Sequence, residues 1–187
     1  MLFSDLKDEL SNYSTAYFAS GCFWCVEAIF ESVKGVKEAV SGYSGGDAKN
    51  ATYKKVSAGL TNHAETVAVY YNPDEISYEE LLIVFFGSHD PTTKNQQGPD
   101  KGRQYRSIIF YQNEQEKLQA ANYIRKLLDD NVFDIITTEL VEFEAFYPAE
   151  KYHQDYKKKN PTDPYVLKVS VPRLEAFKEK HPSLLKK

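Results

Sequence analysis

The chain has 187 residues, of which 42% are hydrophobic and 14% aromatic, and its formal net charge is −4. This length and composition predict one folded domain with a buried core and argue against a disordered chain. Because the net charge is weakly acidic, the composition does not indicate the basic surface that binds nucleic acid or anionic membranes. No stretch has the roughly 20 apolar residues that span a bilayer. Residues 1–10 carry four charged side chains and no apolar run, so we expect no signal peptide and a cytoplasmic location.

Hydrophobic periodicity and turn residues predict strands and helices that alternate irregularly, as in an α+β or mixed α/β domain. In chain order we expect strand 13–19, helix 24–34, strands 36–43 and 64–71, helix 77–86, strand 107–111, helix 114–128, strand 137–143, and helices 149–158 and 171–180. A capping box, Ser77 to Glu80, opens the second helix. The polar loop 89–104 between two of these elements is long enough to indicate a functional segment.

The two cysteines, Cys22 and Cys25, form a C-x-x-C pair at the start of the first predicted helix. In a reducing compartment such a pair indicates redox or thiol chemistry. We expect the helix N-terminus, with Ser20 as a nearby cap, to lower the pKa of the Cys22 thiol. The i, i+3 spacing puts both sulfurs on one side of the helix, so an attacking thiolate and a resolving thiol are both present.

Less reactive interpretations of this segment stay open. Cysteine is often a small buried hydrophobe, and Phe23 and Trp24 between the two cysteines are either core residues or the wall of an apolar pocket. Zinc is disfavoured, because a structural site needs four ligands and the four histidines show no ligand spacing.

Glu65 shares one face of its predicted strand with Val67, Val69 and Tyr71, because side chains alternate along a strand. If that face is buried, the pKa of Glu65 rises and the residue becomes a proton donor near neutral pH. If Glu65 lies at the frayed strand start, it is solvated, and the pattern alone favours neither alternative.

Other segments of the sequence offer hydroxyl and carboxyl groups that could act together with such an acid. Tyr53 and Tyr105 offer hydroxyl donors, although any one of 14 tyrosines is more often structural. Asp100 lies in the long loop, where an aspartate is by default a turn residue. Composition alone does not bring these residues together.

The motifs taken together resemble the peptide methionine sulfoxide reductase A family. They occur in the family's order over about residues 16–161, leaving a C-terminal tail of residues 162–187 in a single domain of residues 1–187. The resembling segments are residues 21–24, 26–28, 35–36, 42–46, 53–56, 63–65, 89–92, 97–100, 104–107 and 146–154.

This resemblance implies an α+β two-layer sandwich with a mixed sheet, and a ferredoxin-like core with additional helices and loops. It implies thiol-dependent reduction of the S epimer of methionine sulfoxide, free or in proteins, by a monomer recycled by thioredoxin without a metal or organic cofactor. The roles implied are Cys22 as nucleophile, Glu65 as acid, Tyr53 and Tyr105 as partners of the sulfoxide oxygen, Asp100 as a lining residue that places the substrate or a water, and Phe23 and Trp24 as the binding site of the substrate methyl group.

The chain departs from the family pattern at Cys25, where glycine is common, and in its tail, which lacks the recycling cysteines of many members. We therefore hypothesise that Cys25 resolves the sulfenic acid formed on Cys22. The alternative is a one-cysteine enzyme whose sulfenic acid is reduced by an external thiol. Rival functions are a general disulfide oxidoreductase and a non-catalytic module that binds oxidised methionine.

Overall fold

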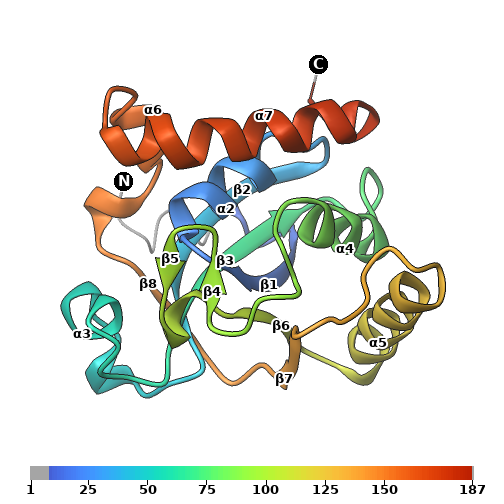
Figure 1. The fold of residues 1–187 in the computed structure, drawn as a ribbon, viewed down its shortest axis with the longest axis horizontal. Helices are drawn as coiled ribbons and strands as arrows, with labels where there is room; N and C mark the ends of the chain where they lie inside the picture. The colour runs from blue at the N-terminus through green and yellow to red at the C-terminus, as the bar shows by residue number, and fades with distance from the viewer. Residues whose placement is uncertain (1–8, 187) are drawn as a thin grey trace.

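The computed structural model describes residues 9–186, so most of the N-terminal segment discussed for a signal peptide lies outside the described residues. Its main feature is a six-stranded sheet with the strand order β7-β6-β1-β3-β2-β8 (Figure 1). Only the β6–β7 pair is parallel. The strands are β1 (Ser14–Ser20), β2 (Val36–Ser44), β3 (Ala64–Tyr71), β6 (Ser107–Tyr111), β7 (Glu139–Glu142) and β8 (Phe146–Pro148).

Helices and short turns connect these strands. The helices are α2 (Phe23–Glu31), α3 (Tyr53–Ser57), α4 (Tyr78–Gly87), α5 (Glu114–Asp129), α6 (Tyr156–Lys159), the π-helix η4 (Val166–Ser170) and α7 (Val171–Lys180). The 3₁₀ turns are η1 (Ala48–Asn50), η2 (Arg103–Tyr105), η3 (Lys151–His153) and η5 (Pro182–Leu184). The loop expected at 89–104 contains a small hairpin of β4 (Gln96–Gln97) and β5 (Asp100–Lys101).

The central part of the fold is ferredoxin-like, as the resemblance implied. The order β1-α2-β2-β3-α4-β6 along the chain gives the spatial order β6-β1-β3-β2, with β1 and β3 in the middle. Helices α2 and α4 contact one face of the sheet, and α7 lies along α2 on the outside (Figure 1). The predicted α+β class is therefore confirmed, and the additional helices are peripheral.

Aromatic packing fixes α2 and α4 on the sheet. The ring of Phe18 on β1 lies 5.2 Å from that of Phe30 on α2 and 5.3 Å from that of Phe85 on α4, measured between centroids. All three side chains are fully buried. Each such ring removes a large apolar area from water, so α2 and α4 are held against β1 by the same buried side chain.

The C-terminal part differs from its prediction. Residues 149–158 do not form one helix: η3 ends at His153, and Asp155 takes a left-handed conformation with φ 55° before α6 begins. The helix expected to end at Lys34 ends at Glu31, and Val33 instead forms an isolated bridge with Leu185. Helix α3 and strand β8 were not predicted.

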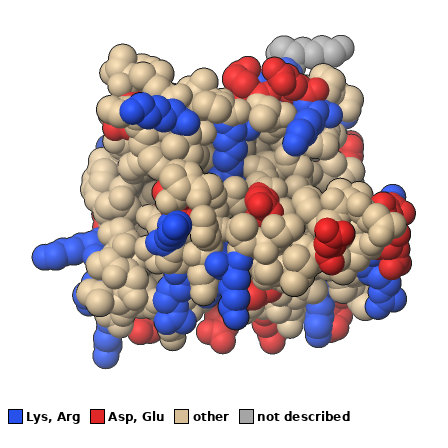
Figure 2. Space-filling view, viewed as in Figure 1, with Lys and Arg blue, Asp and Glu red and all other residues tan. Residues whose placement is uncertain are grey.

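Within residues 9–186, no helix is both long and apolar enough to cross a bilayer. Figure 2 shows one face of the molecule, on which basic and acidic side chains are interspersed rather than separated by sign. The formal net charge of −4 shows in addition that neither sign is in large excess.

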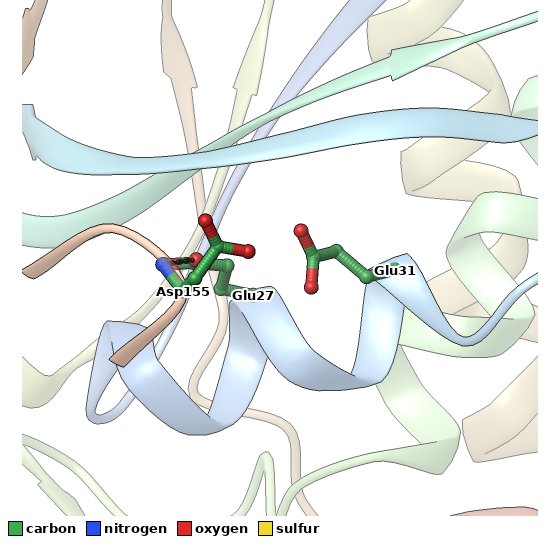
Figure 3. Close-up of side chains that lie close together, drawn as sticks. All are labelled: Glu27, Glu31 and Asp155. Carbon is green, nitrogen blue, oxygen red and sulfur yellow. Dashed lines mark hydrogen bonds between the residues drawn. The ribbon is translucent and has the colours of Figure 1, made fainter. Parts of the chain in front are cut away.

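A cluster of carboxylates explains the break at Asp155 (Figure 3). Glu27 of α2 accepts hydrogen bonds from the Ser41 hydroxyl on β2 and from the backbone N–H of Asp155. Lys158 pairs with Glu31 at 2.8 Å and with Asp155 at 2.9 Å. The cluster therefore ties α2, β2 and α6 together, and the backbone bends at Asp155 to present its N–H to Glu27.

The buried Glu27 gives a pH-dependent contribution to stability. Burial raises its pKa to about 8 in the folded state, so folded protein keeps a proton that the unfolded chain loses near pH 4.5. This contribution is complete below pH 4.5 and is lost as the pH rises toward 8, by up to about 1.4 kcal/mol per pH unit.

We therefore expect the urea unfolding free energy of wild type to fall between pH 5 and 8 more steeply than that of Glu27→Gln, whose amide stays neutral. The exposed Glu79→Gln should keep the wild-type slope. Identical slopes for wild type and Glu27→Gln would show that Glu27 is ionised in the folded protein.

Candidate active site

The site is built at the turn between β1 and α2. Gly21 has φ +90°, and a Cβ there would lie 2.6 Å from Gln97, so both the backbone and the space require glycine. Cys22 is the N-cap residue of α2, and its carbonyl accepts from the N–H groups of Cys25 and Val26. Ser20 does not cap the helix as expected; its side chain is buried and its carbonyl accepts from Arg173.

The carboxylate of Glu65 takes the capping role from the neighbouring strand. Its Oε2 accepts the backbone N–H of Phe23 at 3.0 Å, and the side chain is 2% exposed, on the same buried face as Val67 and Val69. Burial raises the pKa of Glu65 to about 8, and the Phe23 N–H only partly offsets this. The residue is therefore a neutral acid near pH 7, and Oε1 makes no hydrogen bond within residues 9–186.

Two tyrosine hydroxyls lie within electrostatic reach of this acid. Tyr53 begins α3 and Tyr105 ends η2, and both side chains are half-buried. Burial, and then the charge of Glu65, raises the pKa of Tyr53 to about 12 and that of Tyr105 further. Asp100 and Cys22 also act on Tyr105. The structure thus brings together residues that the sequence left scattered, and both hydroxyls remain proton donors.

Aromatic rings form a wall beside Cys22. Trp24 is half-buried and stacks on Tyr156 with centroids 3.7 Å apart, with Tyr165 edge-on at 5.9 Å. The Trp24 indole N–H donates to Nδ1 of His153 at 3.0 Å, which fixes the ring. Phe23, in contrast, is 1% exposed and packs into the core.

Three residues of this wall, His153, Tyr156 and Tyr165, were not singled out from the sequence. Tyr165 donates to Asp100 at 2.5 Å and so links the C-terminal segment to the β4–β5 hairpin. Burial raises the pKa of Asp100, and the Tyr165 hydroxyl opposes this shift. The segment 146–154 pointed to the region of His153, but no local pattern indicates that residues after Pro161 return to the site.

The two cysteines are buried free thiols, and each shifts the pKa of the other. The expectation that the Cys22 pKa is lowered is wrong for this structure, because burial raises it, followed by the interaction with Cys25. The pKa of Cys25 is lowered instead, by the hydrogen bond from Cys22, the charge of Arg173 and the Ser170 hydroxyl. At Cys22, desolvation raises the pKa by more than the helix N-terminus lowers it. The negative charge of the cysteine pair is therefore most stable on Cys25.

The site residues do not form a metal-binding group. Among residues 9–186 the one set of carboxylate, imidazole or thiol ligands close enough for a cation is Glu27, Glu31 and Asp155. These carboxylates are already matched by Lys158 and by hydrogen-bond donors (Figure 3).

Comparisons with known proteins agree with this geometry. Residues 14–184 match the family model of peptide methionine sulfoxide reductase. The chain is 50% identical over 173 residues to peptide methionine sulfoxide reductase MsrA 2 of Synechocystis sp., covering 91% of this chain and 81% of the relative.

Solved structures give the same result. Reduced Mxr1 from Saccharomyces cerevisiae has a TM-score of 0.76 at 35% identity, over 81% of this chain and 88% of that one. Mxr1 in complex with Trx2 has a TM-score of 0.56 at 25% identity, over 78% of this chain and 86% of that one. With the match of the family model to nearly the whole chain, these likenesses show that the chain belongs to the peptide methionine sulfoxide reductase family.

Proposed function

We infer that this chain is a thiol-dependent peptide-methionine (S)-S-oxide reductase in which Cys22 is the nucleophile and Glu65 the acid. The observation that carries the assignment of the site is the neutral carboxyl of Glu65 bonded to the first turn of the helix that begins at Cys22. A thiol and a protonated acid at one buried place are what the reduction of a sulfoxide needs, because the oxygen gains negative charge as the sulfur is attacked.

Substrate binding follows from the aromatic wall. Trp24, with Tyr156 and Tyr165, offers an apolar surface for the methyl group of the substrate, and Phe23 supports it from the core. With the methyl group there, the sulfoxide sulfur faces Cys22. We assign to Asp100, which accepts a hydrogen bond from Tyr165, the placing of the substrate or of a water.

The polar residues of the site receive the sulfoxide oxygen. The hydroxyls of Tyr53 and Tyr105 donate to it, and Glu65 Oε1 supplies the proton that the oxygen needs. When the proton shared by the two thiols lies on Cys25, Cys22 is the thiolate that attacks. Transfer of the oxygen to sulfur and of the Glu65 proton to that oxygen leaves methionine and a Cys22 sulfenic acid.

We propose that Cys25 then resolves the sulfenic acid as a Cys22–Cys25 disulfide. The i, i+3 spacing of the two residues at the start of α2, and the effect of each thiol on the pKa of the other, support this step. An external dithiol reopens the disulfide by exchange, and the yeast relative Mxr1, solved with Trx2, supports thioredoxin as that dithiol. The electrons come from this reductant, so the reaction as proposed uses no metal or organic cofactor.

The remaining proposals concern the whole chain. Residues 1–187 form one reductase domain, because the C-terminal segment supplies Tyr165 to the site rather than being a separate tail. The chain works as a monomer, since every group assigned above comes from one copy. A reducing cytoplasm suits an enzyme whose two cysteines must return to thiols.

Turnover of separate S and R epimers of a methionine sulfoxide peptide, with dithiothreitol as reductant, tests the function. We expect reduction of the S epimer alone. If folded protein with a free Cys22 reduces neither epimer but reduces insulin disulfides, it is a general disulfide oxidoreductase. If it binds the sulfoxide without turnover, it is a binding module.

The acid assignment predicts the effect of Glu65→Gln. The variant should reduce the S epimer about 100-fold more slowly or worse, because an amide cannot supply the proton. In wild type, the rate should fall as the pH rises through about 8, where Glu65 loses its proton, and this fall should be absent in the variant. A variant within a few-fold of wild type would assign proton donation to another group.

The two cysteines should have separable roles. Cys22→Ser should abolish methionine formation, and retained activity would contradict the central assignment. Cys25→Ser should form one equivalent of methionine without reductant and then accumulate a sulfenic acid that dimedone traps. If Cys25→Ser turns over with thioredoxin as wild type does, Cys22 alone reacts with the external thiol.

A further inference from the structure

The C-terminal segment reaches back to the second thiol of the site. The Sγ of Cys25 lies 3.0 Å from the Oγ of Ser170, and both residues are 1% exposed. Ser170 is the last residue of the π-helix η4, 145 residues away in sequence. π-Helix is rare, and single turns of it are frequent at functional sites. Here the wider turn ends with a hydroxyl against the sulfur of Cys25.

A cation is fixed next to this contact. Arg173, one turn further along, donates from Nε to the carbonyl of Ser88 at 2.7 Å and from Nη2 to the carbonyl of Ser20 at 2.8 Å. A Cβ on Gly21 would lie 3.5 Å from its Nη1. The guanidinium is therefore held at the β1–α2 turn by carbonyl groups and forms no ion pair among the described residues. Its positive charge acts on Cys25 and also on Asp100.

Charged and titratable groups act on Cys25 from three parts of the fold: α2, the sheet and the C-terminal segment. Cys22 of α2 and Glu65 of β3 face it from the helix and the sheet, and Tyr165 and Arg173 face it from the C-terminal segment. Tyr165 also carries the link to Asp100. Glu65 is neutral near pH 7, so Arg173 is the positive charge that acts on Cys25, and it stabilises the thiolate form of Cys25.

We propose that Ser170 and Arg173 are positioning residues that hold Cys25 as the resolving thiolate, aimed at the sulfenic sulfur of Cys22. The hydroxyl donates to the sulfur and fixes its position, and the guanidinium supplies the charge. This inference rests on the resolving role proposed for Cys25.

The step itself balances. The Cys25 thiolate attacks the sulfur of the Cys22 sulfenic acid; the S–S bond forms and the S–O bond breaks. The departing hydroxide takes a proton from solvent and leaves as water. The sulfur of Cys25 is oxidised and that of Cys22 is reduced, and no further reactant is needed.

The matched variants Ser170→Ala and Ser170→Thr test the hydroxyl. In a single turnover without reductant, rapid quenching gives the rate of methionine formation, and peptide mass gives the rate of Cys22–Cys25 disulfide formation, both between pH 5 and 9.

We expect Ser170→Ala to form the disulfide about tenfold more slowly, since a hydrogen bond to a charged group is lost, and to need a higher pH to do so. Methionine should form no more slowly than in wild type, because the charge of the pair shifts toward Cys22. Ser170→Thr should restore disulfide formation.

Arg173→Gln and Arg173→Lys form a second matched pair. Arg173→Gln should shift the pH midpoint of disulfide formation upward, and Arg173→Lys, which keeps the charge, should shift it less.

Three outcomes would overturn the inference. One is an unchanged disulfide rate and pH midpoint in Ser170→Ala. Another is equal slowing of both steps, which indicates a structural role. The third is failure of Ser170→Thr to restore the rate. The resolving role proposed for Cys25 fails separately, through normal thioredoxin-dependent turnover of Cys25→Ser, whereas sulfenic acid accumulation in Cys25→Ser with an unaffected Ser170→Ala rejects only the present inference.

Discussion

The hydrogen bond from the Phe23 backbone N–H to Glu65 is the interaction on which the site depends. It joins the first turn of α2 to the buried end of β3, so the nucleophilic cysteine and the acid keep a fixed relation. The core then holds α2 against β1, the strand that pairs with β3, because the ring of Phe18 packs against those of Phe30 and Phe85. A helix N-terminus favours a charged carboxylate, yet burial prevails here. Glu65 is thus held in a fixed position and is neutral at the same time. If Glu65 were exposed to solvent, it would be ionised near pH 7.

The second constraint comes from the end of the chain. Tyr165, Ser170 and Arg173 lie beside α2, and each contacts a different part of the site: the hairpin at Asp100, the sulfur of Cys25 and the turn before Cys22. A segment that contains no cysteine therefore surrounds the thiols with a hydroxyl, a phenol and a guanidinium. The chemistry of the pair is governed by these contacts as much as by the helix that carries it.

The sequence predicted much of this arrangement. Alternation along β3 put Glu65 on the face of Val67 and Val69, and the capping box set the start of α4. The sequence did not decide whether Glu65 is buried, because burial depends on α2 packing above it. The predicted direction of the Cys22 pKa shift was wrong for the same reason. The helix N-terminus can be read from the local sequence, but the burial that raises the pKa comes from residues far away in the chain. The helix expected at 149–158 was lost to a side chain 128 residues away, Glu27, which no local pattern reveals.

The distance along the chain between the cysteines and Ser170 also has a consequence for biosynthesis. A ribosome adds residues at about 5–20 per second, so the stretch from Cys25 to Arg173 takes on the order of 10 s to emerge. During that time the β1–α2 turn exists without the groups that later surround its thiols. A nascent or truncated chain without Ser170 and Arg173 therefore lacks their contacts to Cys25 and to the turn before Cys22, and these contacts form only after both residues have left the ribosome.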